Sequence, residues 1–156
     1  MENAMNQPEW SEIAEVELVY KSNIKASLRP TLTSSREVYE LLLQTWDKNK
    51  IELQEQFKIL LLNRANKVVG IFEVSTGGVS GTIADPKLIF MAALKANACM
   101  IILSHNHPSC NLKPSKADQD LTERIKQGGK LLDINVLDHL IITSDGYYSF
   151  ADEGMI

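Results

Sequence analysis

Residues 99–118 of this chain read CMIILSHNHPSCNLKPSKAD, an apolar run followed by two histidines, a loop with two prolines and an aspartate. The run that begins at Cys99 is short and wholly apolar, which is typical of a buried strand. If that strand continues through His107, the side chains of His105 and His107 point to the same side, because side chains alternate along a strand. Pro108 ends the pairing, and Ser115 begins a helix with Asp118 in its first turn.

This spacing brings together three side chains that are good ligands for a borderline metal such as zinc. Neutral imidazoles from His105 and His107 and the carboxylate of Asp118 would leave a fourth position for water, as in a catalytic zinc site. Each residue alone has a simpler explanation. Ser115 and Asp118 resemble a helix capping box, an aspartate in a first turn is favoured by the helix dipole, and two histidines can be ordinary surface or core residues.

The complete pattern resembles the JAMM (MPN+) metalloprotease motif, and the longer string from His105 to Asp118 is similar to the RadC branch of that superfamily. Two C-terminal stretches, 138–142 and 148–151, are also similar to that branch. The resemblance implies a single-domain α/β fold of the JAB/MPN type (cytidine-deaminase-like), with a mixed sheet flanked by helices, over residues 30–156. Residues 1–29 form an N-terminal segment, with an edge strand expected near 12–20. The helical N-terminal extension of longer RadC relatives is not expected.

One position departs from the branch, which usually has glycine where this chain has Cys110. Glycine adopts backbone angles that cysteine resists, so the loop after the histidines is expected to differ. Cys110 could act there as an extra ligand, as an oxidation-sensitive thiol or as a filler of the loop, and the last role is favoured. Cys99 is expected to be a small buried residue in its strand.

The resemblance further implies a zinc-dependent metallohydrolase that cleaves peptide or isopeptide amide bonds. His105, His107 and Asp118 would hold Zn²⁺, and Ser115 would donate a hydrogen bond to the oxyanion. An upstream glutamate would act as general base. Glu55, just before the apolar strand, is preferred for that role over Glu73, which lies inside the next strand.

The rest of the chain predicts strands alternating with helices, hence an α/β layered fold. A capping box at Ser34 begins a helix, and Asp85-Pro86 begins another. A helix from Ser115 to about 127 is followed by Gly128-Gly129, which either ends or weakens it. The expected segments are helices at 34–47, 86–97 and 115–127, and strands at 55–63, 67–75, 134–143 and 147–150.

Composition narrows the alternatives. At 156 residues, with 44% hydrophobic and 23% charged residues, the chain fits one globular domain, and it has no apolar run of membrane-spanning length. No secretion signal is seen, and a reducing cytoplasm suits the two cysteines. The net charge of −4 gives little support to DNA as a partner.

Two functions remain as alternatives to the metallohydrolase, a non-catalytic binding module and a DNA-repair-associated factor. A zinc deaminase is less favoured, because those enzymes use a Cys-x-x-Cys pair.

Overall fold

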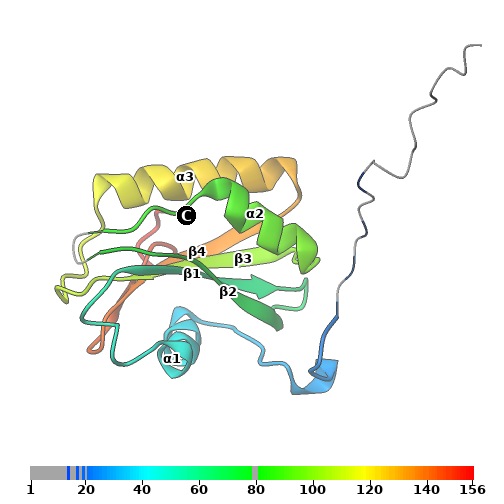
Figure 1. The fold of residues 1–156 in the computed structure, drawn as a ribbon, viewed down its shortest axis with the longest axis horizontal. Coiled ribbons are helices and arrows are strands. Elements are labelled where there is room, and N and C mark those ends of the chain that lie inside the picture. The colour runs from blue at the N-terminus through cyan, green and yellow to red at the C-terminus, as the bar shows by residue number, and fades with distance from the viewer. Residues whose placement is uncertain (1–13, 15–16, 18, 20, 79–80) are drawn as a thin grey trace, which may run out of the picture.

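The computed structural model describes residues 14, 17, 19, 21–78 and 81–156. Within these residues the chain forms a five-stranded sheet with α1 on one face and α2 and α3 on the other (Figure 1). The strand predicted near residues 12–20 lies largely outside the described residues. The elements are the short 3-10 helix η2 (Ala26–Leu28), α1 (Ser35–Thr45), β1 (Gln56–Leu62), β2 (Val68–Thr76), α2 (Pro86–Lys95), β3 (Met100–Asn106), α3 (Lys116–Leu131), β4 (Asn135–Ile142) and β5 (Tyr147–Ser149).

The sheet is mixed, with the strand order β2-β1-β3-β4-β5. β1 pairs antiparallel with both β2 and β3, and β5 pairs antiparallel with β4. β3 and β4 are parallel, so the chain must cross over between them, and α3 is that crossover. The architecture confirms the predicted α/β fold with a mixed sheet flanked by helices. The predicted division at residue 29/30 stays a prediction.

Alternation along the central strands divides the core between the two faces of the sheet. Ile59, Ile101 and Leu103 face α2 and α3, whereas Leu60 and Ile102 face α1. All of these side chains are buried. The residue two beyond Leu103 on the α3 face is His105, so the core packing itself directs that imidazole under the helix.

The predicted helix starts are confirmed by their caps. The side chains of Ser34, Asp85 and Ser115 each accept a hydrogen bond from a backbone N–H of the first helical turn, which satisfies donors that the helix leaves free. The predicted ends are less accurate: α1 stops at Thr45, and α3 runs to Leu131.

The helix α3 passes through Gly128 and Gly129 without ending, because these positions face close neighbours. A Cβ on Gly129 would lie 2.2 Å from the carbonyl oxygen of Ile134, and one on Gly128 would lie 2.8 Å from the ring of Phe90. The glycines let α3 approach α2 and the start of β4. Packing therefore outweighs the low helix propensity of glycine.

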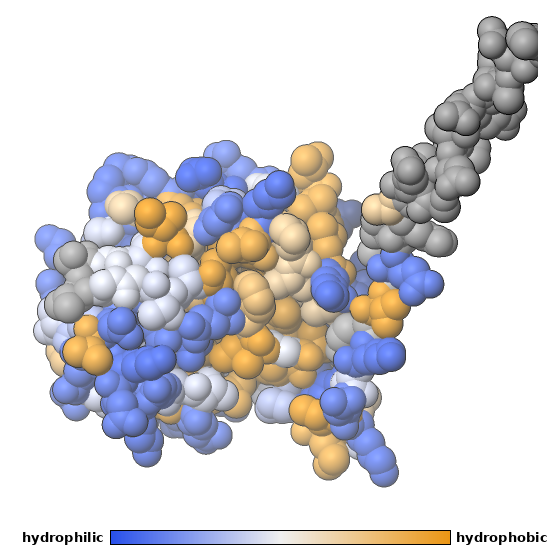
Figure 2. All heavy atoms as spheres, in the orientation of Figure 1, coloured by the Kyte–Doolittle hydropathy of each residue, from blue (hydrophilic) through white to orange (hydrophobic). Residues whose placement is uncertain are grey.

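Apolar side chains are exposed over α2 and the adjacent β2, as the orange area of Figure 2 shows. They include Ile71, Leu88 and Met91. Among the described residues, no helix combines the length and apolar character needed to cross a membrane.

Candidate metal centre

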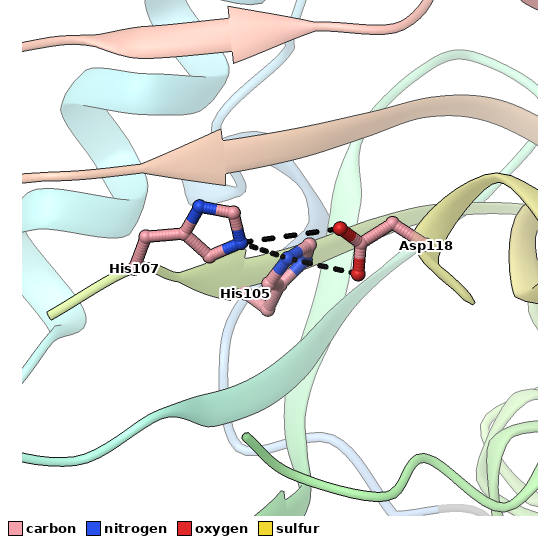
Figure 3. A group of neighbouring side chains, drawn as sticks. All are labelled: His105, His107 and Asp118. Atoms are coloured by element: carbon pink, nitrogen blue, oxygen red, sulfur yellow. Dashed lines mark hydrogen bonds and ion pairs between the residues drawn. The ribbon is translucent and has the colours of Figure 1, made fainter. Parts of the chain in front are cut away.

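The candidate centre lies where β3 ends and α3 begins. His105 is the sixth residue of β3, His107 follows the strand directly, and Asp118 lies in the first turn of α3. The three side chains point toward one another from these two elements (Figure 3). β3 ends at Asn106 rather than at His107. The backbone N–H of His107 still donates to the carbonyl of Ile142, which keeps this residue beside β4.

The potential ligand atoms of the three residues all lie within 4.8 Å of one another. His105 Nε2 is 3.0 Å from His107 Nε2 and 3.3 Å from Asp118 Oδ1. His107 Nε2 is 4.0 Å from Asp118 Oδ2. Ligands of a tetrahedral zinc ion at ordinary bond lengths are about 3.3 Å apart. The donor set and its spacing therefore fit zinc with only small adjustments of the side chains.

His107 directs its Nε2 atom at this centre. Its Nδ1 is hydrogen bonded to the backbone carbonyl of Asn111, and because a carbonyl oxygen can only accept, Nδ1 carries the proton. A neutral His107 then has its lone pair on Nε2, the atom that faces His105 and Asp118. A backbone carbonyl in this position is a common orienting partner of metal-bound histidines.

The loop that supplies that carbonyl contains Cys110, whose φ is +62°. This left-handed conformation is one that glycine adopts freely and cysteine does not. The backbone therefore keeps the shape expected for a glycine, and the cysteine takes on the strain. Cys110 is exposed. In the described part of the chain, the cluster of potential ligand atoms consists of His105, His107 and Asp118 and does not include its thiol.

His105 is almost completely buried, and burial lowers its pKa to about 4, although the nearby Asp118 carboxylate acts in the opposite direction. Its Nδ1 lies 2.8 Å from Nε2 of His139, a buried residue of β4. Burial also holds the pKa of His139 well below its ordinary value. Both imidazoles are therefore neutral near pH 7, the form in which histidine binds a metal.

The two carboxylate oxygens of Asp118 have different surroundings. Its Oδ2 accepts hydrogen bonds from the backbone N–H and the hydroxyl of Ser115, both at 2.7 Å, and its own N–H donates to the Ser115 hydroxyl at 3.1 Å. This is a complete capping box. The other carboxylate oxygen, Oδ1, remains directed at His105. The capping and metal-site explanations of the sequence are thus compatible, since the cap holds the carboxylate toward the histidines.

Ser115 and Glu55 line one polar cavity of about 460 Å³ together with His107 and Asp118. The Ser115 hydroxyl is committed to Asp118, so a hydrogen bond from it to a substrate requires that bond to be exchanged. Glu55 is half-buried. Desolvation is the main cause that raises its pKa, the Asp118 charge adds to this, and His107 and the backbone N–H of Thr82 oppose it.

The backbone of Glu55 is held by the segment that follows β2. Its carbonyl accepts from Gly77 N–H, and its N–H donates to the carbonyl of Gly78. Gly77 must be glycine, because a Cβ there would lie 2.0 Å from the carbonyl oxygen of Gly81. These contacts hold Glu55 at the edge of the cavity.

Glu73 belongs to a different cluster. Its carboxylate accepts from Thr76 Oγ1 at 2.6 Å and from Gln56 Nε2 at 3.3 Å, and it lies 3.8 Å from Lys58 Nζ. It is not among the residues that line the cavity at His107. The structure therefore brings Glu55, and not Glu73, to the predicted ligands.

Three further residues at the centre were not singled out from the sequence. Asn106, between the two histidines, is fully buried and hydrogen bonded to residues 51–56. His139 and Thr122 are buried behind His105. A polar residue on the opposite face of a buried strand is a detectable signal for Asn106. No local pattern indicates the pairing of Thr122 with His139.

Comparison with known proteins agrees with this architecture. The family model described as RadC-like JAB domain matches residues 32–155. A UPF0758 protein of Flavobacterium johnsoniae is 50% identical over 101 residues, which are 65% of this chain and 44% of that protein. A UPF0758 protein of Porphyromonas gingivalis is 43% identical over 130 residues, 82% of this chain and 56% of that protein. The chain thus spans about half the length of these curated relatives. It belongs to the RadC-like JAB domain family.

Proposed function

We propose that this protein is a zinc-dependent metallohydrolase that cleaves peptide or isopeptide amide bonds. The observation that carries the proposal is the convergence of His105, His107 and Asp118 beside a half-buried glutamate in one cavity. Two imidazoles and one carboxylate are a donor set of catalytic zinc sites, which keep a position open for water or substrate.

Zinc held by these residues would supply Lewis-acid activation of a water molecule and of the amide carbonyl. Glu55 is the residue of the cavity suited to take the proton from that water. Its raised pKa brings the carboxylate closer to the range in which it can both accept a proton and release it to the leaving amine. Ser115 would donate to the oxyanion once its bond to Asp118 has been exchanged.

The cavity supports an extended polar substrate rather than a small apolar one. Its wall includes Asn111, Lys113 and Thr82 in addition to the proposed catalytic groups. Peptide backbones present regularly spaced amide donors and carbonyl acceptors that such a wall can bind. We place the protein in the cytoplasm, because free cysteines such as exposed Cys110 suit a reducing compartment.

The first test is metal content. Purified wild-type protein, produced without a histidine tag, should contain one zinc per chain by mass spectrometry, whereas His105→Ala, His107→Ala and Asp118→Ala should retain little. Asp120→Ala, in the same helix with a solvent-exposed carboxylate, is the matched control and should keep its zinc. Full zinc occupancy in all three ligand variants would refute the assignment.

The second test separates catalysis from metal binding. Glu55→Gln should keep zinc and lose about a hundredfold or more of the hydrolysis measured with a library of peptide and isopeptide-linked substrates, because glutamine cannot accept the proton. Glu73→Gln is the control and should retain wild-type activity. An inactive Glu73→Gln together with an active Glu55→Gln would show that the general base is assigned to the wrong residue.

A further inference from the structure

A continuous chain of buried hydrogen bonds connects two of the proposed metal ligands behind the centre. Thr122 Oγ1 lies 2.6 Å from the backbone carbonyl oxygen of Asp118 and 2.6 Å from His139 Nδ1. His139 Nε2 then lies 2.8 Å from His105 Nδ1. Thr122, His139 and His105 are all at most 2% exposed. This series of hydrogen bonds, called the relay below, begins at the backbone carbonyl of Asp118 and ends at the ring of His105.

The donor and acceptor of every hydrogen bond in the relay follow from its first acceptor. The Asp118 carbonyl can only accept, so the single hydroxyl proton of Thr122 is donated to it. Thr122 Oγ1 is then left with lone pairs toward His139 and must accept the proton of His139 Nδ1. A neutral His139 with its proton on Nδ1 has a bare Nε2, which accepts from His105.

We propose that Thr122 and His139 are positioning residues that hold His105 in its Nδ1–H tautomer and so keep its Nε2 lone pair directed at the metal position. His105 Nε2 faces His107 Nε2 at 3.0 Å and Asp118 Oδ1 at 3.3 Å. In the other tautomer, Nε2–H would donate to that carboxylate and exclude a cation. The proposed function supplies the identity of the cation, and the tautomer itself does not depend on it.

Aromatic packing holds the rings of His105 and His139 in the orientation that the relay requires. His139 stacks on Phe150 with ring centres 4.7 Å apart and an interplanar angle of 19°. Phe57 lies nearly parallel to His105 at 5.8 Å and meets His139 edge-on at 5.6 Å. Rotating either imidazole would break both the stacking and a buried hydrogen bond. The relay is thus defined by sterics as well as by hydrogen bonding.

The decisive variant is Thr122→Val, which removes the hydroxyl and keeps the shape. His139 Nδ1 then has no polar partner in either tautomer, so the bias that passes to His105 disappears. Nitrogen-15 spectra of chelator-treated protein report directly which ring nitrogen carries the proton, and the chain has only three histidines to assign. Wild type should show the proton of His105 on Nδ1, and Thr122→Val should show it shared between the two nitrogens.

Zinc affinity, measured by competition with a chromophoric chelator, is the second readout. Thr122→Val should weaken zinc binding by up to about tenfold, the lower end of the effect of removing a direct orienting partner of a histidine ligand, because Thr122 acts on His105 only through His139. Thr122→Ser restores the hydroxyl and should restore both the tautomer and the affinity. Thr45→Val is the matched control, since Thr45 Oγ1 also donates to a helix carbonyl, that of Leu42, but far from this chain.

If Thr122→Val does not fold, His139→Phe serves instead, because it keeps the stacked ring and removes both nitrogens. In this variant too, the proton of His105 should be shared between its two ring nitrogens. A His105 proton that stays on Nδ1 in the variant, or zinc affinity within twofold of wild type, would overturn the proposal. A wild type that binds no zinc would refute the proposed function alone, since the spectra of the metal-free protein still test the relay.

Discussion

Replacing Asn106 with alanine should be among the most damaging single changes to this fold. The Asn106 side chain is fully buried and makes three hydrogen bonds. Its Nδ2 donates to the carbonyls of Ile51 and Gln54 at 2.6 and 2.8 Å, and its Oδ1 accepts from the N–H of Gln56 at 2.7 Å. It therefore ties the end of β3 to the segment that carries Glu55.

The magnitude follows from the groups left behind. Asn106→Ala would leave three backbone groups without a hydrogen-bond partner, namely the carbonyls of Ile51 and Gln54 and the N–H of Gln56. A buried polar group without a partner costs about 1–3 kcal/mol. The carbonyls of Ile51 and Gln54 lie next to exposed residues and can recover some hydrogen bonding from water, so the lower end applies to these two groups, whereas the N–H of the buried Gln56 costs more. The free energy of unfolding should fall by about 3–4 kcal/mol, a large share of the 5–15 kcal/mol typical of a domain.

Urea unfolding followed by circular dichroism measures this change, as a lower midpoint at an unchanged slope. Asn135→Ala, at the exposed first residue of β4, is the control and should alter stability by less than about 0.5 kcal/mol. A loss below about 1 kcal/mol for Asn106→Ala would refute the reasoning. Zinc content should decline less than hydrolytic activity, because Glu55 is displaced more than the ligands.

Three other perturbations follow from the structure. Cys110→Gly should raise stability by up to about 1 kcal/mol in the same assay, because the left-handed φ of +62° costs cysteine more than glycine adds in unfolded-state entropy; a destabilised variant would contradict this. Gly129→Ala should lower the thermal midpoint despite the better helix propensity of alanine, because its Cβ meets a backbone oxygen, while Gly128→Ala, which meets only a side chain, should cost less. In zinc-free protein, burial lowers the pKa of His105 to about 4 and also lowers that of His139, so the unfolded state binds more protons in acid and the free energy of unfolding should fall as the pH drops from about 6.5 toward 4. The fall should be smaller in His139→Phe. An equal fall would contradict the idea that the buried histidines cause it.

The three predicted ligands were recognisable in the sequence because they lie within fourteen residues of one another. Strand alternation, the proline after His107 and the capping box at Ser115 all act over a few residues, so their geometry depends little on the rest of the chain. The same local rules predicted where the helices start and which segments of the chain form strands, but not the order of the strands in the sheet. They could not resolve Gly128-Gly129, where the contact of Gly129 with Ile134, and not propensity, keeps α3 continuous.

Tertiary structure decided which distant side chains reach that motif. The antiparallel register of β1 and β3 pairs Phe57 with His105, which brings Glu55, two residues earlier, to the mouth of the centre. Glu73 is drawn instead to Lys58 on the neighbouring strand. The parallel pairing of β3 with β4 brings His139 behind His105. Contacts of this kind depend on strand register and on how α3 packs, and neither is encoded by the spacing of a few neighbouring residues. The sequence alone therefore determined which residues are the candidate ligands, and the fold determined which side chains surround them.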